Sequence, residues 1–222
     1  MHRHYKTILL FALIVAVLAI FFIFKKTSTM PWEESGNLVI AIKTTPGSKT
    51  NNTFEIGIDN IELYKKNGET KQITILTKRI LLNKNNNELE LLLNVNVPVG
   101  EYSGVGFTMK SPEIKNPWQE DEAPEYVSLL NDHISLKKEF KVKKDTTSAI
   151  ILSFESFNAM HKDNDEQVYL PIIQMETRTN LAVKEINKNV IKITGGDIEN
   201  ISTFGMDWDG RMRYNFRPKP KK

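Results

Sequence analysis

Residues 88–97 read ELELLLNVNV, and this stretch decides the fold class of the chain. Leucine or valine recurs there at every second position, which is the period of a β-strand with one buried face. We therefore expect a strand that turns Glu90, Asn94 and Asn96 toward water. Its predicted core-facing residues are Leu89, Leu91, Leu93, Val95 and Val97.

The two-residue period continues on both sides of this stretch. Residues 54–58 alternate, and Ile61 continues the pattern in the opposite phase, which predicts a β-bulge near Asn60. Turn signals separate the strands: Asn-Gly at 67–68 predicts a hairpin, and Pro-Val-Gly at 98–100 predicts a turn. The other expected strands are 37–42, 72–76, 102–109, 133–136, 139–142, 148–154, 167–175 (with Pro171 at an edge or a bulge), 190–194, 197–202, 204–206 and 212–216.

No long segment after residue 26 has the 3.6-residue period of a helix. The sequence therefore predicts an all-β fold, an antiparallel β-sandwich of Ig-like or transthyretin-like architecture, preceded by one N-terminal transmembrane helix. The expected organisation is a basic N-terminus (1–6), a transmembrane helix (7–24), a spacer (25–36), the β-sandwich (37–179), a small β appendage or sheet extension (180–216) and a basic tail (217–222).

Residues 7–24 read TILLFALIVAVLAIFFIF, without a charge, glycine or proline. As a helix this run covers about 27 Å, close to the thickness of a bilayer core of about 30 Å. The alternative is a cleaved secretory signal, but such a signal has a shorter apolar region and a small-residue cleavage site. The run instead ends in bulky rings followed by Lys25 and Lys26, which favours an uncleaved anchor.

Positive charges flank this run almost equally on both sides, so the positive-inside rule decides its orientation only weakly. We expect the N-terminus inside and the C-terminal domain outside the cytoplasm, because a short signal anchor ahead of a long domain usually exports it. The chain has a formal net charge of +3, but residues 27–210 hold 20 lysines and arginines against all 27 acids, a net charge of −7. The absence of cysteine excludes disulfides, thiol catalysis and thiolate metal sites.

The segment between Met109 and Tyr126 is the best candidate for a ligand-binding loop. It holds three prolines, one tryptophan and five acids, and long loops in compact domains are often functional or disordered. A solvated loop is the alternative reading. The predicted ligand-binding residues are Trp118, Glu120, Asp121 and Glu122.

Catalytic motifs are missing from the chain, so we expect no enzyme and no cofactor. His133 and His161 are the histidines outside the N-terminus, and neither has the spacing that places two metal ligands on one element. A metal-assisted hydrolase that uses His161 is the enzyme alternative. Asp207-Trp208-Asp209-Gly210 has a fragment of a calcium-loop spacing but is better read as a hairpin turn.

Residues 36–179 resemble a bacterial and archaeal family known as domain of unknown function 4382. The resemblance rests on GNLVI at 36–40, FEIGIDNIELYKKNG at 54–68, VPVGEY at 97–102 and the stretch 154–173. It implies an exported or membrane-anchored β-sandwich and brings no known activity. One departure is Lys43-Thr44-Thr45-Pro46, where members of the family often carry an aspartate.

Two functional hypotheses follow from these patterns. The first is a single-pass cell-membrane protein that displays an extracytoplasmic β-domain as an interaction or structural module. The second is a ligand-binding module for a glycan or a peptide, or a calcium-dependent one, that uses the Trp118 loop. The expected partners are the lipid bilayer through residues 7–24 and a cell-surface polymer or protein, and no nucleic acid, because the body of the domain is acidic.

Overall fold

The computed structural model describes residues 34–44, 53–82, 88–115, 125–155, 160–163, 166–187 and 189–218. The chain divides into two compact units, Met1–Glu34 and Ser35–Lys222, and all the strands described below belong to the second. The expected membrane helix at 7–24 lies outside the described residues. Within the described ranges, no helix is long and apolar enough to cross a membrane. Every regular element in those ranges is a β-strand, which confirms the all-β class.

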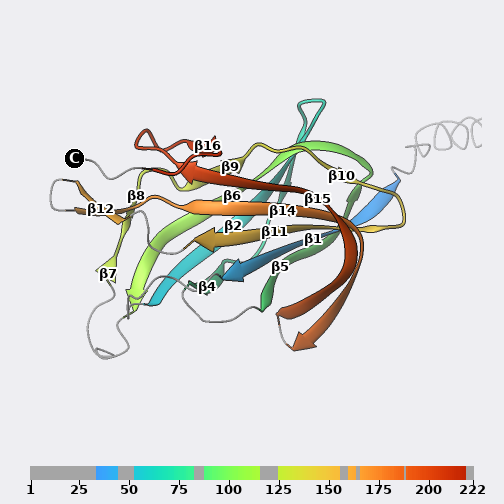
Figure 1. The fold of residues 1–222 in the computed structure, drawn as a ribbon, viewed down its shortest axis with the longest axis horizontal. Coiled ribbons are helices and arrows are strands. Elements are labelled where there is room, and N and C mark those ends of the chain that lie inside the picture. Colours follow the sequence, from blue (N-terminus) through green and yellow to red (C-terminus); the bar gives the residue numbers. More distant parts are fainter. Residues whose placement is uncertain are drawn as a thin grey trace, which may run out of the picture. The chain divides into compact units, whose positions relative to one another are not determined.

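The first sheet, sheet A, has β1 near its centre (Figure 1). Its strands pair antiparallel except for β1 and β11, which run parallel from Asn37 and Thr147 onward. β14 and β15, which lie far apart in the order given below, also pair with each other. In spatial order the strands are β14 (Ile172–Asn187), β11 (Thr147–Glu155), β1 (Ser35–Thr44), β5 (Leu89–Pro98), β15 (Val190–Met206) and β16 (Met212–Tyr214).

The second sheet, sheet B, is built around the pair of long strands β2 (Thr53–Lys65) and β6 (Gly100–Lys115). Short strands flank this pair on both sides. The flanking strands are β3 (Thr70–Ile73) and β4 (Lys78–Leu82) on β2, and β7 (Glu125–Tyr126), β9 (His133–Leu136) and β10 (Phe140–Val142) on β6. A small third sheet joins β12 (Met160–Asp163), β13 (Glu166–Tyr169) and β8 (Ser128–Leu129).

The main hydrophobic core draws on both large sheets. Ile40 of β1 and Ile58 of β2 are fully buried members of it. Phe107 of β6 and Phe154 of β11 meet edge to face with their ring centroids 6.2 Å apart, so one aromatic pair links sheet B to sheet A. The two sheets therefore share one apolar interior.

The strand that decided the fold class carries an irregularity that its sequence hides. The register between β1 and β5 shifts because Ile40 pairs with Leu93 whereas Ala41 pairs with Leu91, so Leu92 is the extra residue of a bulge. The expectation that five alternating residues share one face is therefore wrong. Leu93, Val95 and Val97 face the main core, but Leu89 and Leu91 pack against a second cluster on the opposite face of sheet A.

The bulge predicted near Asn60 is confirmed. The register between β2 and β6 shifts between Asp59 and Glu62, and Asn60 has a φ of 50°. Ile58 before the shift and Ile61 after it are both fully buried, as the phase change in the sequence requires.

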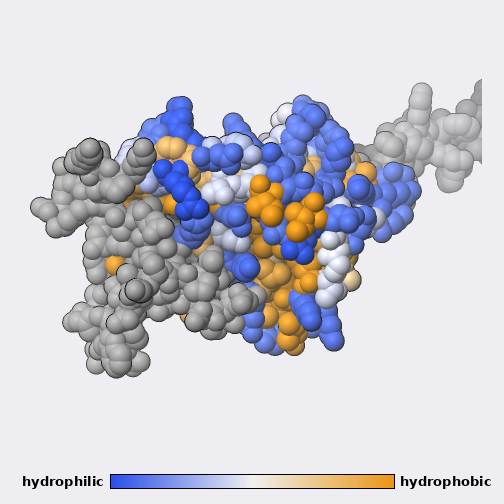
Figure 2. Space-filling model, in the orientation of Figure 1, coloured by the Kyte–Doolittle hydropathy of each residue, from blue (hydrophilic) through white to orange (hydrophobic). Residues whose placement is uncertain are grey.

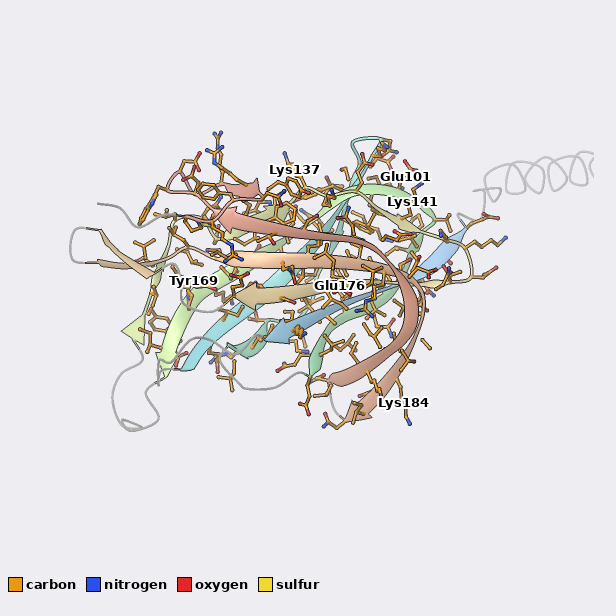
Figure 3. The ribbon with its side chains drawn as sticks, viewed as in Figure 1. Glu101, Lys137, Lys141, Tyr169, Glu176 and Lys184 are labelled. Carbon is orange, nitrogen blue, oxygen red and sulfur yellow. The ribbon has the colours of Figure 1, made fainter. Side chains whose placement is uncertain are left out.

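The hairpin of β14 and β15 bends over the outer face of sheet A (Figure 1). Three residues with positive φ form the bend: Asn180 on one strand, and Gly195 and Gly196 on the other. Beyond it, Ile191 at the far end of the hairpin pairs with Leu89 of β5. Lys184, labelled in Figure 3, belongs to this distal part of β14.

The second hydrophobic cluster lies under this hairpin. Leu181 and Ile191 from beyond the bend pack there with Val39 and Ala41 of β1 and with Ala149 of β11. The strands expected at 190–194, 197–202 and 204–206 are thus one strand, β15, bent at its glycines rather than interrupted by them.

Pro171 separates two strands where one was expected across residues 167–175. β13 ends at Tyr169 in the small sheet, and β14 begins at Ile172 in sheet A. Proline has no N–H to donate, so it occupies the point where the chain leaves one sheet for another. Its carbonyl still accepts a hydrogen bond from the backbone N–H of Met206.

The turn between β5 and β6 is closed by a buried hydroxyl. Tyr102 is 1% exposed and its hydroxyl donates to the carbonyl of Pro98 at 2.7 Å. We expect Tyr102→Phe to lower the free energy of unfolding by about 1–2 kcal/mol, because the Pro98 carbonyl loses a buried donor. Urea denaturation of the purified full chain measures this. An unchanged midpoint would contradict it.

Candidate functional site

The predicted ligand-binding residues Trp118, Glu120, Asp121 and Glu122 lie outside the described residues. The structure does place the two ends of their loop. β6 continues to Lys115, beyond the expected strand end at Met109, and β7 begins at Glu125. Because Glu113 pairs with Tyr126, both ends of the loop are held on sheet B.

The other candidate chemistry of the sequence is placed only in part. His161 belongs to β12, and its side chain lies outside the description. Asp207 and Asp209 lie at the turn before β16, and the guanidinium of Arg213 donates to both carboxylates at 2.7 Å. Gly210, with a φ of 76°, closes this turn, which is the predicted hairpin turn. Among the described residues, no three histidine or acidic side chains gather to hold a metal ion.

A row of carboxylates that sequence analysis did not single out lines the outer face of sheet B. Glu55, Asp59 and Glu62 stand along β2, and their side chains are 12%, 17% and 18% exposed. Acidic side chains this well covered require partners, because burying a charge without compensation is costly. The three carboxylates differ in the partners they have.

Two of the three are neutralised by permanent cations. Glu55 accepts a hydrogen bond from the guanidinium of Arg79 at 3.0 Å. Asp59 lies 3.4 Å from the ammonium of Lys110 and accepts a hydrogen bond from the hydroxyl of Thr77 at 3.1 Å.

Glu62 is surrounded by different chemistry. It accepts hydrogen bonds from the hydroxyl of Tyr64 at 2.9 Å and from the amide of Gln72 at 3.3 Å. The imidazole of His133 lies 3.8 Å away and is charged only when protonated. No lysine or arginine in the described part of the chain forms an ion pair with Glu62. We call Glu62, Tyr64, Gln72 and His133 together the Glu62 site.

Gly106 makes this arrangement sterically feasible. It pairs with Glu62 across the sheet, and a Cβ atom at this position would lie 2.1 Å from the hydroxyl of Tyr64. The missing side chain leaves room for the Tyr64 ring to reach across β6 to His133 of β9, where the hydroxyl lies 3.2 Å from Nε2. The phenolic proton is donated to Glu62, and the same hydroxyl lies within hydrogen-bond distance of His133 Nε2.

The position of Tyr64 predicts a measurable titration. Burial is the largest effect and raises the pKa of Tyr64 above its usual value of 10.0. A hydrogen bond with Ser135 lowers this pKa, whereas the hydrogen bond to Glu62 and the charge of Glu62 raise it. The fold thus favours the protonated phenol, and the stability that this group contributes is present below about pH 10 and is lost as the pH rises further. We expect Gly106→Ala to push the phenol outward and to lower its pKa toward 10.

Nuclear magnetic resonance titration of tyrosine-labelled protein measures this shift, with Tyr64→Phe to assign the signal. A Tyr64 pKa that is the same with and without the Gly106→Ala change would contradict the expectation.

A second charged group lies where β10 pairs with β6. Lys141 lies 2.8 Å from Glu101, and Lys66 lies 3.1 Å from the same carboxylate (Figure 3 labels Glu101 and Lys141). Hydrogen bonds and charge from Lys141 and then Lys66 lower the pKa of Glu101. Lys66 and Glu101 also line a small cavity of about 290 Å³. All three side chains are well exposed, and exposed ion pairs of this kind contribute little to stability.

Comparison with known proteins assigns the chain to no group. No family model matches the sequence, no curated protein matches it, and no solved structure matches the fold.

Proposed function

We propose that this chain is a single-pass membrane protein that displays its β-domain outside the cytoplasm as an interaction or structural module, without enzymatic activity. The supporting sequence feature is the apolar run at 7–24 with Lys25 and Lys26 behind it. The observation that carries the proposal is the position of β1. It begins at Ser35, and it is flanked on both sides by other strands of sheet A.

A tether at this point suits display of a folded domain. Ten residues lie between Phe24 and Ser35, so the proposed anchor precedes β1 closely in the sequence. Anchoring through an inner strand also distributes any pull over the hydrogen bonds to β5 and β11.

We further propose that the domain is a β-sandwich related to domain of unknown function 4382. Support comes from the main core, to which both large sheets contribute, and from the sequence motifs that resemble the family. The parallel pairing of β1 with β11 is the structural feature by which a relative with the same topology would be recognised.

Protease treatment of intact cells tests the display. We expect proteinase K to remove the β-domain from intact cells, and a C-terminal epitope tag reports its loss. A cytoplasmic protein that survives in intact cells and is cut after lysis controls for leakage. A domain that stays uncut until lysis would overturn the outward orientation.

Membrane retention tests the anchor separately. We expect the chain to remain in the membrane after alkaline carbonate extraction and to keep residues 7–24 when its N-terminus is sequenced. Release into the soluble fraction with a new N-terminus after residue 24 would show a cleaved signal instead.

A ligand-binding role of the Trp118 loop is a second candidate, supported by the pairing of β6 with β7 that holds both ends of the loop on sheet B. We expect Trp118→Ala to abolish binding to a glycan array probed with and without calcium. An array on which the unmodified protein has no hits in either condition would contradict a ligand-binding role of the Trp118 loop.

A further inference from the structure

We propose that the Glu62 site receives a cationic side chain, a lysine or an arginine, from a basic segment of a partner protein. This inference rests on the proposed role as an interaction module and names the partner chemistry of one surface. Its starting point is the unequal treatment of the three carboxylates along β2. Arg79 forms an ion pair with Glu55, and Lys110 forms one with Asp59. Glu62 instead accepts hydrogen bonds from two neutral donors and lies near an imidazole.

Glu62 retains capacity for a further donor. An ionised carboxylate offers about four lone-pair positions over its two oxygens. Tyr64 donates to Oε2 and Gln72 donates to Oε1, so one hydrogen bond at each oxygen fixes the group in place. The site is thus preorganised, and its charge is still available to a cation.

The surroundings of the carboxylate favour a cation over a neutral group. The ionised carboxylate attracts a positive charge, and the two groups that donate to it, the Tyr64 hydroxyl and the Gln72 amide, are neutral. The attraction is local to Glu62, because the unit Ser35–Lys222 holds 26 lysines and arginines against 25 acids, a net charge of +1. A basic segment is therefore drawn to Glu62 itself and not to the net charge of the domain.

The depth of the carboxylate selects the kind of cation. Glu62 is only 18% exposed, whereas His133 beside it is 45% exposed. A lysine or arginine carries its charge at the end of a long flexible stem and can reach a recessed oxygen. An amine attached directly to a sugar ring has no such stem, which is why a protein segment fits the site better than an amino sugar.

The test uses the full chain in detergent micelles and a fluorescent octa-lysine peptide at low salt. We expect Glu62→Gln to weaken binding about fivefold, because an isosteric amide removes one charge-assisted hydrogen bond from a partly exposed site. Glu55→Gln is the matched control. It removes the same charge from the same strand, next to Arg79, and should change binding by less than about twofold.

Three outcomes would overturn the proposal: no binding of octa-lysine by the unmodified chain, equal weakening by Glu62→Gln and Glu55→Gln, or tighter binding of a glucosamine oligomer than of the peptide. Equal weakening would mean that the peptide responds to any carboxylate on β2 and not to Glu62 in particular. Because the assay is independent of which side of a membrane the domain faces, its failure and the failure of the display proposal are distinguishable.

A measurement on the unmodified chain covers the case in which Glu62→Gln does not fold. In histidine-labelled protein, the imidazole signal of His133 should move when octa-lysine is added, and His133→Gln assigns that signal. A peptide with acetylated lysines should leave the signal in place. A His133 signal that ignores octa-lysine would overturn the proposal.

Discussion

Replacement of Phe107 by alanine should lower the free energy of unfolding by about 3–5 kcal/mol, as expected for removing a large buried ring without collapse of the cavity. Phe107 is fully buried on β6, and its ring meets that of Phe154 on β11. The substitution therefore removes apolar contact area and an aromatic contact between the two sheets at once. Urea denaturation of the purified chain measures the loss.

A double-mutant cycle separates the aromatic contact from simple burial. Phe107→Ala and Phe154→Ala should be less than additive, with a coupling of about 0.5–1.5 kcal/mol. Tyr126→Ala, at a side chain that is 62% exposed, is the control and should change stability by less than about 0.5 kcal/mol. Fully additive effects of the two phenylalanines would mean that the rings do not support each other.

Replacement of Gly196 by alanine should destabilise the bent hairpin more than any other single methyl group added at its bend. Gly196 has a φ of 86°, and a Cβ atom there would lie 2.9 Å from the Cβ of Leu181 and 2.9 Å from the carbonyl oxygen of Thr179. The conformation alone costs about 1–2 kcal/mol for a residue with a side chain. The clash with a backbone oxygen adds to this, so we expect a total of about 3 kcal/mol.

Gly195→Ala is the matched control for that substitution. Gly195 also has a positive φ, of 69°, but a Cβ atom there meets nothing within 4 Å. It should therefore show the conformational cost alone, about 1–2 kcal/mol. Hydrogen exchange at Ile191, which packs under the hairpin, reports whether the Gly196→Ala chain loses this cover. Equal effects of the two substitutions would contradict the steric argument.

Local patterns predicted the strands better than their continuity. The change in the phase of the apolar residues around Asn60 predicted the bulge, because a strand that keeps one face buried must shift phase where a residue is inserted. Residues 88–97 show no such change of phase. Leucines at consecutive positions can be buried on either face of β5, because an apolar cluster lies on each face of sheet A. An irregular strand with two apolar environments reads in sequence as a regular strand with one.

The sequence did not show what the glycines at 195–196 do to the strand. The expected strands 190–194 and 197–202 were separated at these two glycines, and both have positive φ angles. Whether they would end a strand or bend one depends on Asn180 in the partner strand, which adopts the same left-handed region. That match is a property of the pair of strands.

The Glu62 site could not be found along the chain. Glu62 and Tyr64 are neighbours on β2, but Gln72 comes from β3 and His133 from β9. His133 lies 69 residues from Tyr64, and it arrives only because β6 places Gly106 between them. A glycine within a strand signals a close approach but does not name the group that approaches.

The sequence by itself determined the all-β class, the main turns and the −7 charge of residues 27–210, because strand period, turn chemistry and charge count are local properties. Only the tertiary structure decided that Leu92 is inserted and that β14 and β15 bend over sheet A. It also decided that Glu62 has no ion pair with a lysine or arginine of the described residues, whereas Glu55 and Asp59 do. The physical reason is the same in each case. Which side chain compensates a charge or covers an apolar face depends on strands that meet across the sheet, and their register is set by packing over the whole domain.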